Sequence, residues 1–392
     1  MTERFFAPCP RGLEGALAAE LTALGATFVT LAEGGVGCAG SRELAYHANL
    51  ESRIASRILW QVAHGSYRNA DELYALAKGI DWGRHFTVER TLRVDLTATR
   101  SPLTSLEFAT LKVKDAVCDR FRADTGKRPS IDKERPDVRV HAYLTEREAT
   151  LYLDTSGGAL FKRGWRHDVD VAPLRENLAA GVLALAGWTP GTALLDPMCG
   201  AGTIAIEAAL KAADIAPGLQ RTFGFQKLAW FDGPTWQRIR QRARDRMRPA
   251  PPAPAIFASD IDPRAIEQCR RNAAAAGVAA WLDMSAGDVL ARTAPAPAGL
   301  LVANPPYGVR LEDDAALAAF YPKLGDALKQ HFAGWTACLM TGDARLVKLI
   351  GLKPSKRTPL YNGAIECRLY RFEIVTGRPR RAAREGSSVG PE

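Results

Sequence analysis

The sequence predicts an α/β protein in which a doubly wound sheet follows a smaller α+β region. In the C-terminal half, short apolar runs end in polar or glycine-rich turns and lead into helical segments, which is the alternation of parallel βαβ units. In the N-terminal half, helical segments are interspersed with alternating apolar and polar runs that are typical of half-buried strands. We therefore expect two different sheets within one chain.

Length and composition are those of a globular protein with two or three domains. The chain has 392 residues, of which 47% are hydrophobic and 24% charged. Its first residues include no basic segment followed by an apolar core, so we expect no signal peptide, and no stretch has the apolar length of a membrane span. The seven cysteines are scattered without a Cys-x-x-Cys pair, which argues against a zinc site or a disulfide framework and fits a reducing cytoplasm.

The net charge of +9 is unevenly placed along the chain. Residues 1–170 are nearly balanced, whereas residues 171–392 carry 28 lysines and arginines against 20 acidic residues. A basic surface suits a polyanion, and nucleic acid is the obvious one. Charge alone equally permits a basic enzyme without such a partner.

The N-terminal half divides into two α+β units. Residues 1–60 contain an apolar helical pattern from 13 to 24, a strand pattern from 27 to 31, and a second helix that Ser41 can cap. The next unit, 61–157, has helical patterns at 70–78 and 106–123 and strand patterns at 91–99, 138–144 and 149–153. Arg100 precedes the second of these helices. We expect that helix to place Lys112 and Lys114 near Arg100.

Residues 158–172 form a basic linker. Its core, Leu160–Arg166, interleaves Lys162, Arg163 and Arg166 with Phe161 and Trp165. Such a segment can pair with phosphates while its aromatic rings stack on bases. A linker with solvated charges is an equally good interpretation.

The first chemical motif, Asp196–Thr203, lies between a strand pattern at 192–195 and a helix pattern at 204–213. Its glycines allow close approach of a ligand to the backbone, and the helix offers free N–H groups at its start. The dinucleotide signature Gly-x-Gly-x-x-Gly is absent, because position 205 is alanine. A carboxylate four residues before the first glycine favours a cationic or zwitterionic ligand, and S-adenosylmethionine is such a ligand.

A second strand pattern, 256–262, ends in acids that can bind ribose hydroxyls. Asp260 lies 58 residues after Gly202, whereas about 20 is usual in dinucleotide folds. The excess is an insertion, roughly 214–254, with an arginine-rich helix. Because its arginines step by two, they spread around that helix, and a solvated helix is the favoured interpretation.

The central motif follows the strand pattern at 301–303. There Asn304-Pro305-Pro306-Tyr307 ends an apolar run, because proline fixes φ and donates no N–H. An amide oxygen and a backbone carbonyl can together accept both hydrogens of an exocyclic amine while an aromatic ring stacks on its base. The alternative is a Pro-Pro turn that merely closes a core strand.

Three further segments complete the expected fold. Asp288 follows a short strand and is placed to meet an adenine. Runs at 335–341 and 369–374 would complete the sheet, and a tail at 377–392 looks disordered. Four polar strand ends in sequence are what a doubly wound sheet with its ligand on one edge predicts.

These motifs carry a family resemblance. Asp196–Thr203 resembles the cofactor motif of class I methyltransferases, and Asn304–Tyr307 resembles the [Asn/Asp]-Pro-Pro-[Tyr/Phe] motif of members that methylate amino groups. The N-terminal half resembles the ferredoxin-like and THUMP arrangement of RNA-modifying enzymes. With Asp154–Gly157, Lys162–Arg166 and Leu360–Cys367, nearly the whole chain looks like the bacterial 23S rRNA guanine-N2 methyltransferases.

The resemblance implies an organisation and a chemistry. It implies a ferredoxin-like subdomain (1–60), a THUMP RNA-binding domain (61–157), the basic linker (158–172) and a Rossmann-like methyltransferase domain (173–376). It implies that S-adenosylmethionine contacts Asp196, Pro197, Cys199, Gly200, Gly202, Thr203, Asp260, Ile261, Asp288 and Asn304.

The resemblance also implies the roles of the catalytic motif. Asn304 and the Pro305 carbonyl would accept the two hydrogens of guanine N2, Pro306 would complete the turn, and Tyr307 would stack on the flipped base. RNA contacts would come from Arg100, Lys112, Lys114, Lys162, Arg163 and Arg166. No metal is expected.

Three other functions remain open. A transfer-RNA guanine-N2 methyltransferase with a THUMP domain differs only in substrate. A DNA adenine-N6 methyltransferase would use the same Asn-Pro-Pro-Tyr chemistry, although the THUMP-like half favours RNA. A non-catalytic RNA-binding protein could keep the fold with an inactive site.

Overall fold

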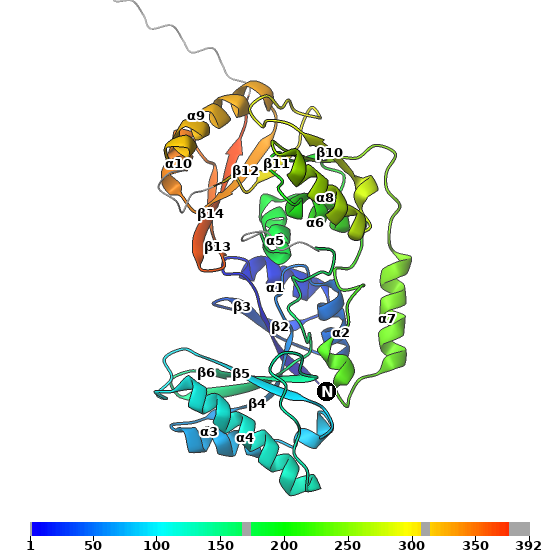
Figure 1. Ribbon diagram of the computed structural model, residues 1–392, viewed down its shortest axis with the longest axis vertical. Coiled ribbons are helices and arrows are strands. Elements are labelled where there is room, and N and C mark those ends of the chain that lie inside the picture. The colour runs from blue at the N-terminus through cyan, green and yellow to red at the C-terminus, as the bar shows by residue number, and fades with distance from the viewer. Residues whose placement is uncertain (1, 167–173, 307–313, 376–392) are drawn as a thin grey trace, which may run out of the picture.

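A computed structural model describes residues 2–166, 174–306 and 314–375, and these form two seven-stranded sheets (Figure 1). The first sheet belongs to the N-terminal half and the second to the C-terminal half. Within these ranges, no helix combines the length and apolarity needed to span a bilayer. Residues 376–392 lie outside them, and with them the expected tail.

The first sheet is mostly antiparallel and is covered by four helices in the described N-terminal half. Its strands, in spatial order, are β2 (Thr27–Ala32), β3 (Gly35–Gly40), β1 (Glu3–Pro8), β4 (Leu59–Ser66), β7 (Glu148–Asp154), β6 (Val138–Leu144) and β5 (Leu92–Ala98). The helices are α1 (Glu14–Ala23), α2 (Arg42–Glu51), α3 (Ala70–Lys78) and α4 (Leu106–Thr125), with a 3₁₀ turn at Trp82–Arg84.

Strand β4, which the sequence patterns did not predict, joins the two N-terminal units. It pairs with β1 on one side, where Trp60 lies opposite Phe5, and with β7 on the other, where Leu59 lies opposite Asp154. The boundary expected between residues 60 and 61 therefore falls inside a strand, and the two units share one continuous sheet.

The second sheet has the doubly wound order that the sequence predicts. Its strands are β10 (Leu282–Ala286), β9 (Ile256–Asp260), β8 (Leu194–Asp196), β11 (Leu300–Ala303), β12 (Thr336–Thr341), β14 (Ile365–Glu373) and β13 (Lys356–Asn362). The first five are parallel, and the unpredicted β13 forms an antiparallel hairpin with β14 at one edge. The described helices are α5 (Glu176–Ala186), α6 (Thr203–Ala212), α7 (Gly233–Asp245), α8 (Pro263–Ala275), α9 (Asp314–His331) and α10 (Ala344–Leu349).

The insertion between α6 and β9 lies against the N-terminal half (Figure 1). Trp236 of α7 is 1% exposed and lies 5.9 Å from the Tyr46 ring of α2, and the Tyr46 hydroxyl accepts a hydrogen bond from the Asp232 N–H. The expectation of a solvated helix was therefore wrong for one face of α7: the arginines point mostly outward, while Trp236, Ile239 and Ala243 are buried. A solvated helix was expected from the spacing of the arginines alone, although apolar residues lie between them in the sequence.

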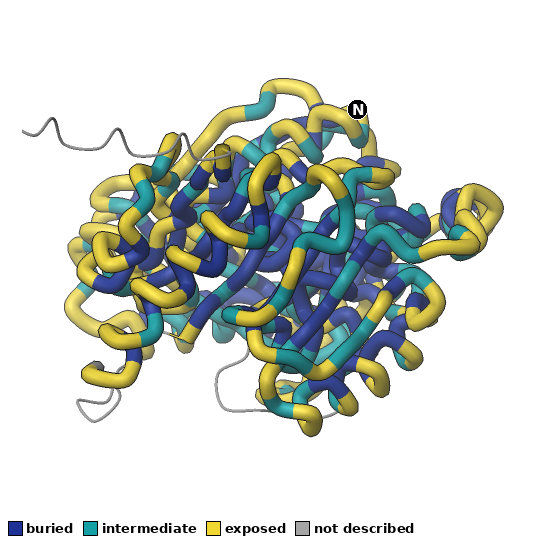
Figure 2. The backbone as a smooth tube through the Cα atoms, turned by 90° about the horizontal axis from the view of Figure 1, so that it is seen from above, coloured by how far each residue is buried: buried dark blue, intermediate teal, exposed yellow. Residues whose placement is uncertain are grey.

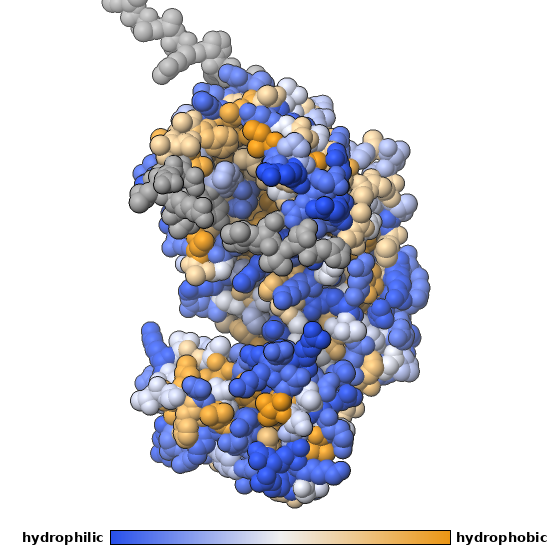
Figure 3. Space-filling model, viewed as in Figure 1, coloured by the Kyte–Doolittle hydropathy of each residue, from blue (hydrophilic) through white to orange (hydrophobic). Residues whose placement is uncertain are grey.

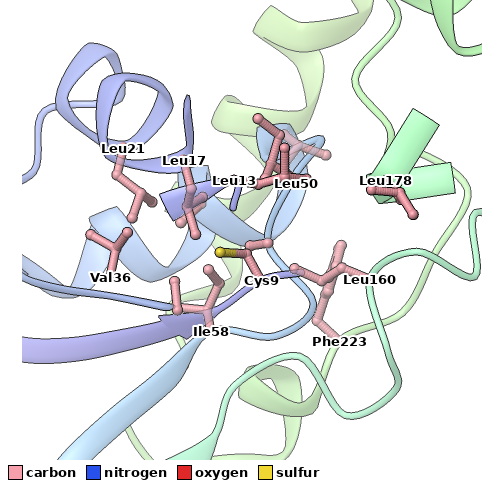
Figure 4. Packing of buried hydrophobic residues seen from close by; sticks show 14 of the residues in the cluster. Cys9, Leu13, Leu17, Leu21, Val36, Leu50, Ile58, Leu160, Leu178 and Phe223 are labelled. Atoms are coloured by element: carbon pink, nitrogen blue, oxygen red, sulfur yellow. The ribbon is translucent and has the colours of Figure 1, made fainter. Parts of the chain in front are cut away.

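One hydrophobic core runs through both halves of the chain (Figure 4). Leu13 and Leu17 come from the first unit, Leu178 from α5, and Leu160 and Phe223 from the linker and the insertion. Figure 2 shows buried stretches of the chain at the centre with exposed residues around them, and the face in Figure 3 is mainly hydrophilic with small hydrophobic patches. The two halves therefore pack as one body.

A buried ion pair lies within this junction. Arg163 and Glu207 of α6 are 3.1 Å apart, with side chains 2% and 0% exposed. Arg163 also donates hydrogen bonds to the carbonyls of Leu160 and Arg53. The expectation that Arg163 contacts RNA was therefore wrong, because its side chain is 2% exposed and its guanidinium is engaged by Glu207 and two backbone carbonyls. Basic residues between aromatics do not by themselves distinguish a phosphate contact from an internal ion pair.

We expect Arg163→Met to lower the free energy of unfolding by about 3 to 5 kcal/mol, because it leaves the Glu207 carboxylate buried without its partner. Chemical denaturation of the full chain measures this loss. The control is Lys162→Met, which makes the same exchange at the exposed neighbouring position and should change stability by less than about 0.5 kcal/mol. Equal effects of the two substitutions would contradict a structural role for Arg163.

Candidate active site

The site lies at the point where the strand order of the second sheet reverses. β8 is flanked by β9 on one side and β11 on the other, and all three are parallel. Ligands bind beyond the carboxyl ends of the strands at such a point. Asp196 ends β8, Asp260 ends β9, and Asn304 directly follows β11. The fold therefore brings three predicted site residues to one edge.

The turn after β8 depends on Gly202, which caps α6 with φ +84°. A Cβ at this position would lie 2.3 Å from the Cys269 Sγ of α8, so only glycine fits between the two helices.

A hydrogen bond to Cys269, together with burial, raises the pKa of the Cys199 thiol. That thiol therefore stays protonated and is not a nucleophile at neutral pH. The buried Pro197 completes the turn.

Asp260 organises the neighbouring turns. Its carboxylate accepts hydrogen bonds from the N–H groups of Gly200, at 2.9 Å, and Asp262, at 3.0 Å, while its backbone carbonyl accepts one from Gly287. Beside it, Ile261 is 71% exposed. Asp288 is exposed, and one of its carboxylate oxygens accepts the Leu290 N–H at 2.9 Å. Asp260 thus links the turns after β8, β9 and β10.

Three buried oxygens at this edge make no hydrogen bond to any described residue. They are the Asp196 Oδ1, the Ser259 Oγ and the Asn304 Oδ1. Leaving buried polar groups unpaired is costly, so these oxygens at neighbouring strand ends are candidates for contact with a ligand. Ser259 was not among the predicted site residues, because an inward-facing serine in an apolar strand looks like an ordinary core residue.

Burial, opposed by the Met198 N–H and aided by the negative charge of Asp260, raises the pKa of Asp196 to about 8. The carboxyl is 1% exposed. It is therefore mostly protonated at neutral pH, and a cation placed beside it would favour its ionised form.

Helix α9 fixes the turn after β11. The Tyr321 hydroxyl donates to the Pro306 carbonyl at 3.3 Å, and burial raises the pKa of Tyr321 to about 12, so it remains a donor. Pro305 is buried and Pro306 exposed. Tyr307 lies outside the described residues. Nothing in the motif itself indicates Tyr321, which follows Pro306 by 15 residues.

The expected RNA contacts are dispersed. Arg100 is exposed with φ +56°, Lys112 pairs with Asp71 at 2.7 Å, and Lys114 pairs with Asp115 at 3.0 Å. These three belong to the first sheet and its helix α4, far along the chain from Asn304. Their position leaves the RNA assignment a prediction.

The two remaining linker residues that were expected to contact RNA, Lys162 and Arg166, differ in exposure. Lys162 is exposed. Arg166 is mostly buried, lies 3.4 Å from Glu176, and donates to the Thr203 Oγ1 at 2.7 Å. Because Thr203 begins α6, Arg166 attaches the linker to the cofactor motif, which is a different role from the surface phosphate contact that we expected.

Comparison with known proteins matches three family models in succession. They are described as the RlmL ferredoxin-like domain (residues 4–59), the THUMP domain (67–154) and the RMKL-like methyltransferase domain (163–371). The third covers more than half of the chain. All three agree with the motifs from which the resemblance was inferred.

Individual relatives agree with these matches. "Ribosomal RNA large subunit methyltransferase K/L" of Syntrophotalea carbinolica is 44% identical over 385 residues, which are 96% of this chain and 54% of that protein. The chain thus spans about half the length of the curated relatives it matches.

Two solved structures align over most of their length. The SMU.472 protein complexed with SAH has a TM-score of 0.87 and 29% identity, covering 95% of this chain and 98% of that one. A Listeria monocytogenes protein entitled "predicted N6-adenine-specific DNA methylase" has a TM-score of 0.86 and 30% identity, covering 95% and 96%. Sheet order, motif placement and these matches agree, and the chain belongs to the family of the RMKL-like methyltransferase domain, preceded by RlmL ferredoxin-like and THUMP domains.

Proposed function

We propose that this protein transfers a methyl group from S-adenosylmethionine to the exocyclic N2 amine of a guanine in 23S rRNA. The observation that carries the proposal is the buried, unpaired Asn304 Oδ1 directly after β11, followed by the Pro305 carbonyl. The curated relatives named for the large ribosomal RNA and the match to a THUMP domain support an RNA substrate.

The described residues fit S-adenosylmethionine. Asp196 would hold the ammonium of its methionine part, close to the backbone of Gly200 and Gly202. Asp260 would accept from the ribose hydroxyls, while Ile261 and Asp288 would contact the adenine face and amine. The solved relative complexed with SAH supports a cofactor of this kind. The unpaired Ser259 Oγ gives the same ligand one further polar partner.

Asn304 and Pro305 would hold the target amine. Guanine N2 is a poor nucleophile, because its lone pair is delocalised into the ring. If both N–H groups donate out of the ring plane, to the Asn304 Oδ1 and the Pro305 carbonyl, the nitrogen becomes pyramidal and its lone pair points away from them. Tyr321 stabilises this geometry by holding the next carbonyl in place.

The chemical step then requires alignment more than proton transfer. S-adenosylmethionine supplies an electrophilic methyl group when bound. The residues at the strand ends bring the amine and that methyl into line. The entropy cost of bringing the two reactants together is then met on binding and no longer adds to the barrier of the chemical step. The bond from N2 to the methyl carbon would form as the bond from that carbon to the sulfonium sulfur breaks. The proton displaced from N2 would then pass to water, so no strongly activated base is needed.

One alternative substrate has an observation in its favour. The Listeria relative is entitled an adenine-N6 DNA methylase, and adenine N6 is also an exocyclic amine that Asn304 could hold. The THUMP domain favours RNA over DNA, and transfer RNA is the alternative within RNA. An inactive RNA-binding protein would not need the buried unpaired oxygens at this edge.

Substrate profiling tests the proposal. Purified full chain would be incubated with radiolabelled S-adenosylmethionine and, separately, protein-free 23S rRNA, 16S rRNA, transfer RNA and duplex DNA. We expect label in N2-methylguanosine from 23S rRNA alone. Label in transfer RNA would retain the mechanism with another substrate, whereas methyladenine in DNA would overturn the assignment of base and nucleic acid.

We expect Asn304→Ala to lower kcat about 100- to 1000-fold, because one of the two acceptors for the amine is lost. The dissociation constant of S-adenosylmethionine, measured by calorimetry, should change less than about threefold because Asp196 and Asp260 hold the cofactor. Asn304→Asp keeps an acceptor oxygen and should retain more turnover than Asn304→Ala. Loss of cofactor binding in Asn304→Ala, rather than of turnover, would contradict the role given to Asn304.

The pH dependence of cofactor binding tests Asp196. Below its raised pKa of about 8 the free protein holds this carboxyl protonated, so a cationic ligand that favours the carboxylate must release a proton on binding. Affinity for S-adenosylmethionine should therefore rise between pH 6 and pH 7.5, by up to about tenfold per pH unit. Asp196→Asn should bind more weakly and lose this slope. An unchanged slope in that variant would show that another group titrates.

A further inference from the structure

A groove of about 610 Å³ separates the linker from the β13–β14 hairpin. Its walls are formed by Phe161, Lys162 and Arg166 of the linker, Arg175 at the start of α5, and Asn362 and Ile365 at the hairpin turn. The volume lies within the range of sites that enclose a ligand the size of a nucleotide.

The groove opens beside the catalytic edge. Within the antiparallel pair of β12 and β14, Thr341 lies opposite Arg368, so residues 365–367 extend beyond the carboxyl end of β12. This is the same edge of the sheet at which Asn304 follows β11. On the opposite wall, Arg166 donates to Thr203, the first residue of α6. One wall of the groove is therefore attached to the cofactor motif through Arg166.

The hairpin wall is held in place by the N-terminal half, toward which β13 and β14 reach in Figure 1. A Cβ at Gly12 would lie 2.3 Å from the Pro359 carbonyl oxygen, and the Arg11 guanidinium lies 4.9 Å from the centre of the Tyr361 ring. The hairpin therefore cannot move away from the linker without breaking contacts to the first unit. The groove is a fixed feature of the junction between the halves.

The lining combines cations with flat and apolar surfaces. The Arg175 guanidinium lies 5.0 Å from the centre of the Phe161 ring, and Arg175 and Lys162 are exposed. Ile365 is 44% exposed on the facing wall. The acidic lining residue Glu176 is buried and ion-paired with Arg166. A guanidinium stacked on an aromatic ring next to an exposed lysine suits a base and its phosphate.

We propose that this groove binds the unpaired nucleotide next to the target guanine. The neighbouring base stacks between Arg175 and Ile365, and its phosphate pairs with Lys162. Extrusion of the target base leaves its neighbour without a stacking partner, and the groove replaces that partner. The inference rests on the proposed RNA substrate and specifies which part of the protein receives the flanking strand.

Photocrosslinking locates the nucleotide. Protein-free 23S rRNA transcribed with 4-thiouridine would be irradiated with the full chain, and crosslinked peptides identified by mass spectrometry. We expect crosslinks in the peptides that contain Phe161 and Ile365. Crosslinks confined to the first sheet and α4 would overturn the proposal.

Kinetics measure the contribution of the groove. Arg175→Ala should raise the KM for 23S rRNA about 5- to 150-fold, which is the range for loss of one base stack. The dissociation constant of S-adenosylmethionine should stay within about twofold. The control is Arg242→Ala, the same substitution at an exposed position of α7, which should leave KM unchanged. Ile365→Asp, which introduces an acid on the facing wall, should also raise KM.

The outcomes separate the two proposals. If Arg175→Ala and Ile365→Asp keep the KM of the wild-type protein while Asn304→Ala loses turnover, the groove proposal fails and the proposed function stands. If the wild-type protein methylates no RNA, the proposed function fails, and crosslinks outside the groove would then reject the groove as well. Equal increases in KM for Arg175→Ala and Arg242→Ala would indicate general charge attraction and overturn a specific site.

Discussion

The buried pair of Arg163 and Glu207 is the interaction on which the arrangement of the two halves depends. Its charges are stable in the interior only because each satisfies the other and because Arg163 also donates to carbonyls of the linker and of the first unit. Glu207 belongs to α6, the helix that begins at Gly202 and Thr203. The same contact that joins the halves therefore positions the turn expected to hold the cofactor.

At the ends of neighbouring strands, the fold keeps several polar atoms without a hydrogen bond. Asp196, Ser259 and Asn304 each present a buried oxygen that the described residues leave without a hydrogen bond. Such an arrangement is unfavourable in the free protein, and a ligand that supplies donors would stabilise it. The neighbouring Asp260 differs, because each of its carboxylate oxygens already accepts one backbone N–H and keeps further lone pairs for a ligand.

Much of the second sheet was predictable from the sequence because four of its five parallel strands end in a local signal, such as Asp196 before Gly200 or Asn304 before two prolines. Features that arise from contacts across the chain were not. Strand β4 has no clear alternation, the burial of Arg163 depends on Glu207, and Tyr321 reaches Pro306 only through the packing of α9. The sequence did contain a signal for the apolar face of α7, because Trp236 and Ile239 are spaced to lie on one side of a helix.

The long insertion has a consequence for synthesis of the chain. Tyr46 and Trp60 are covered partly by Trp230 and Trp236, which leave the ribosome about 170 to 190 residues later. At ordinary translation rates that interval is about 10 to 40 s. During this time Tyr46 and Trp60 lack part of their cover, so the first unit keeps an aromatic surface exposed until the insertion has been made.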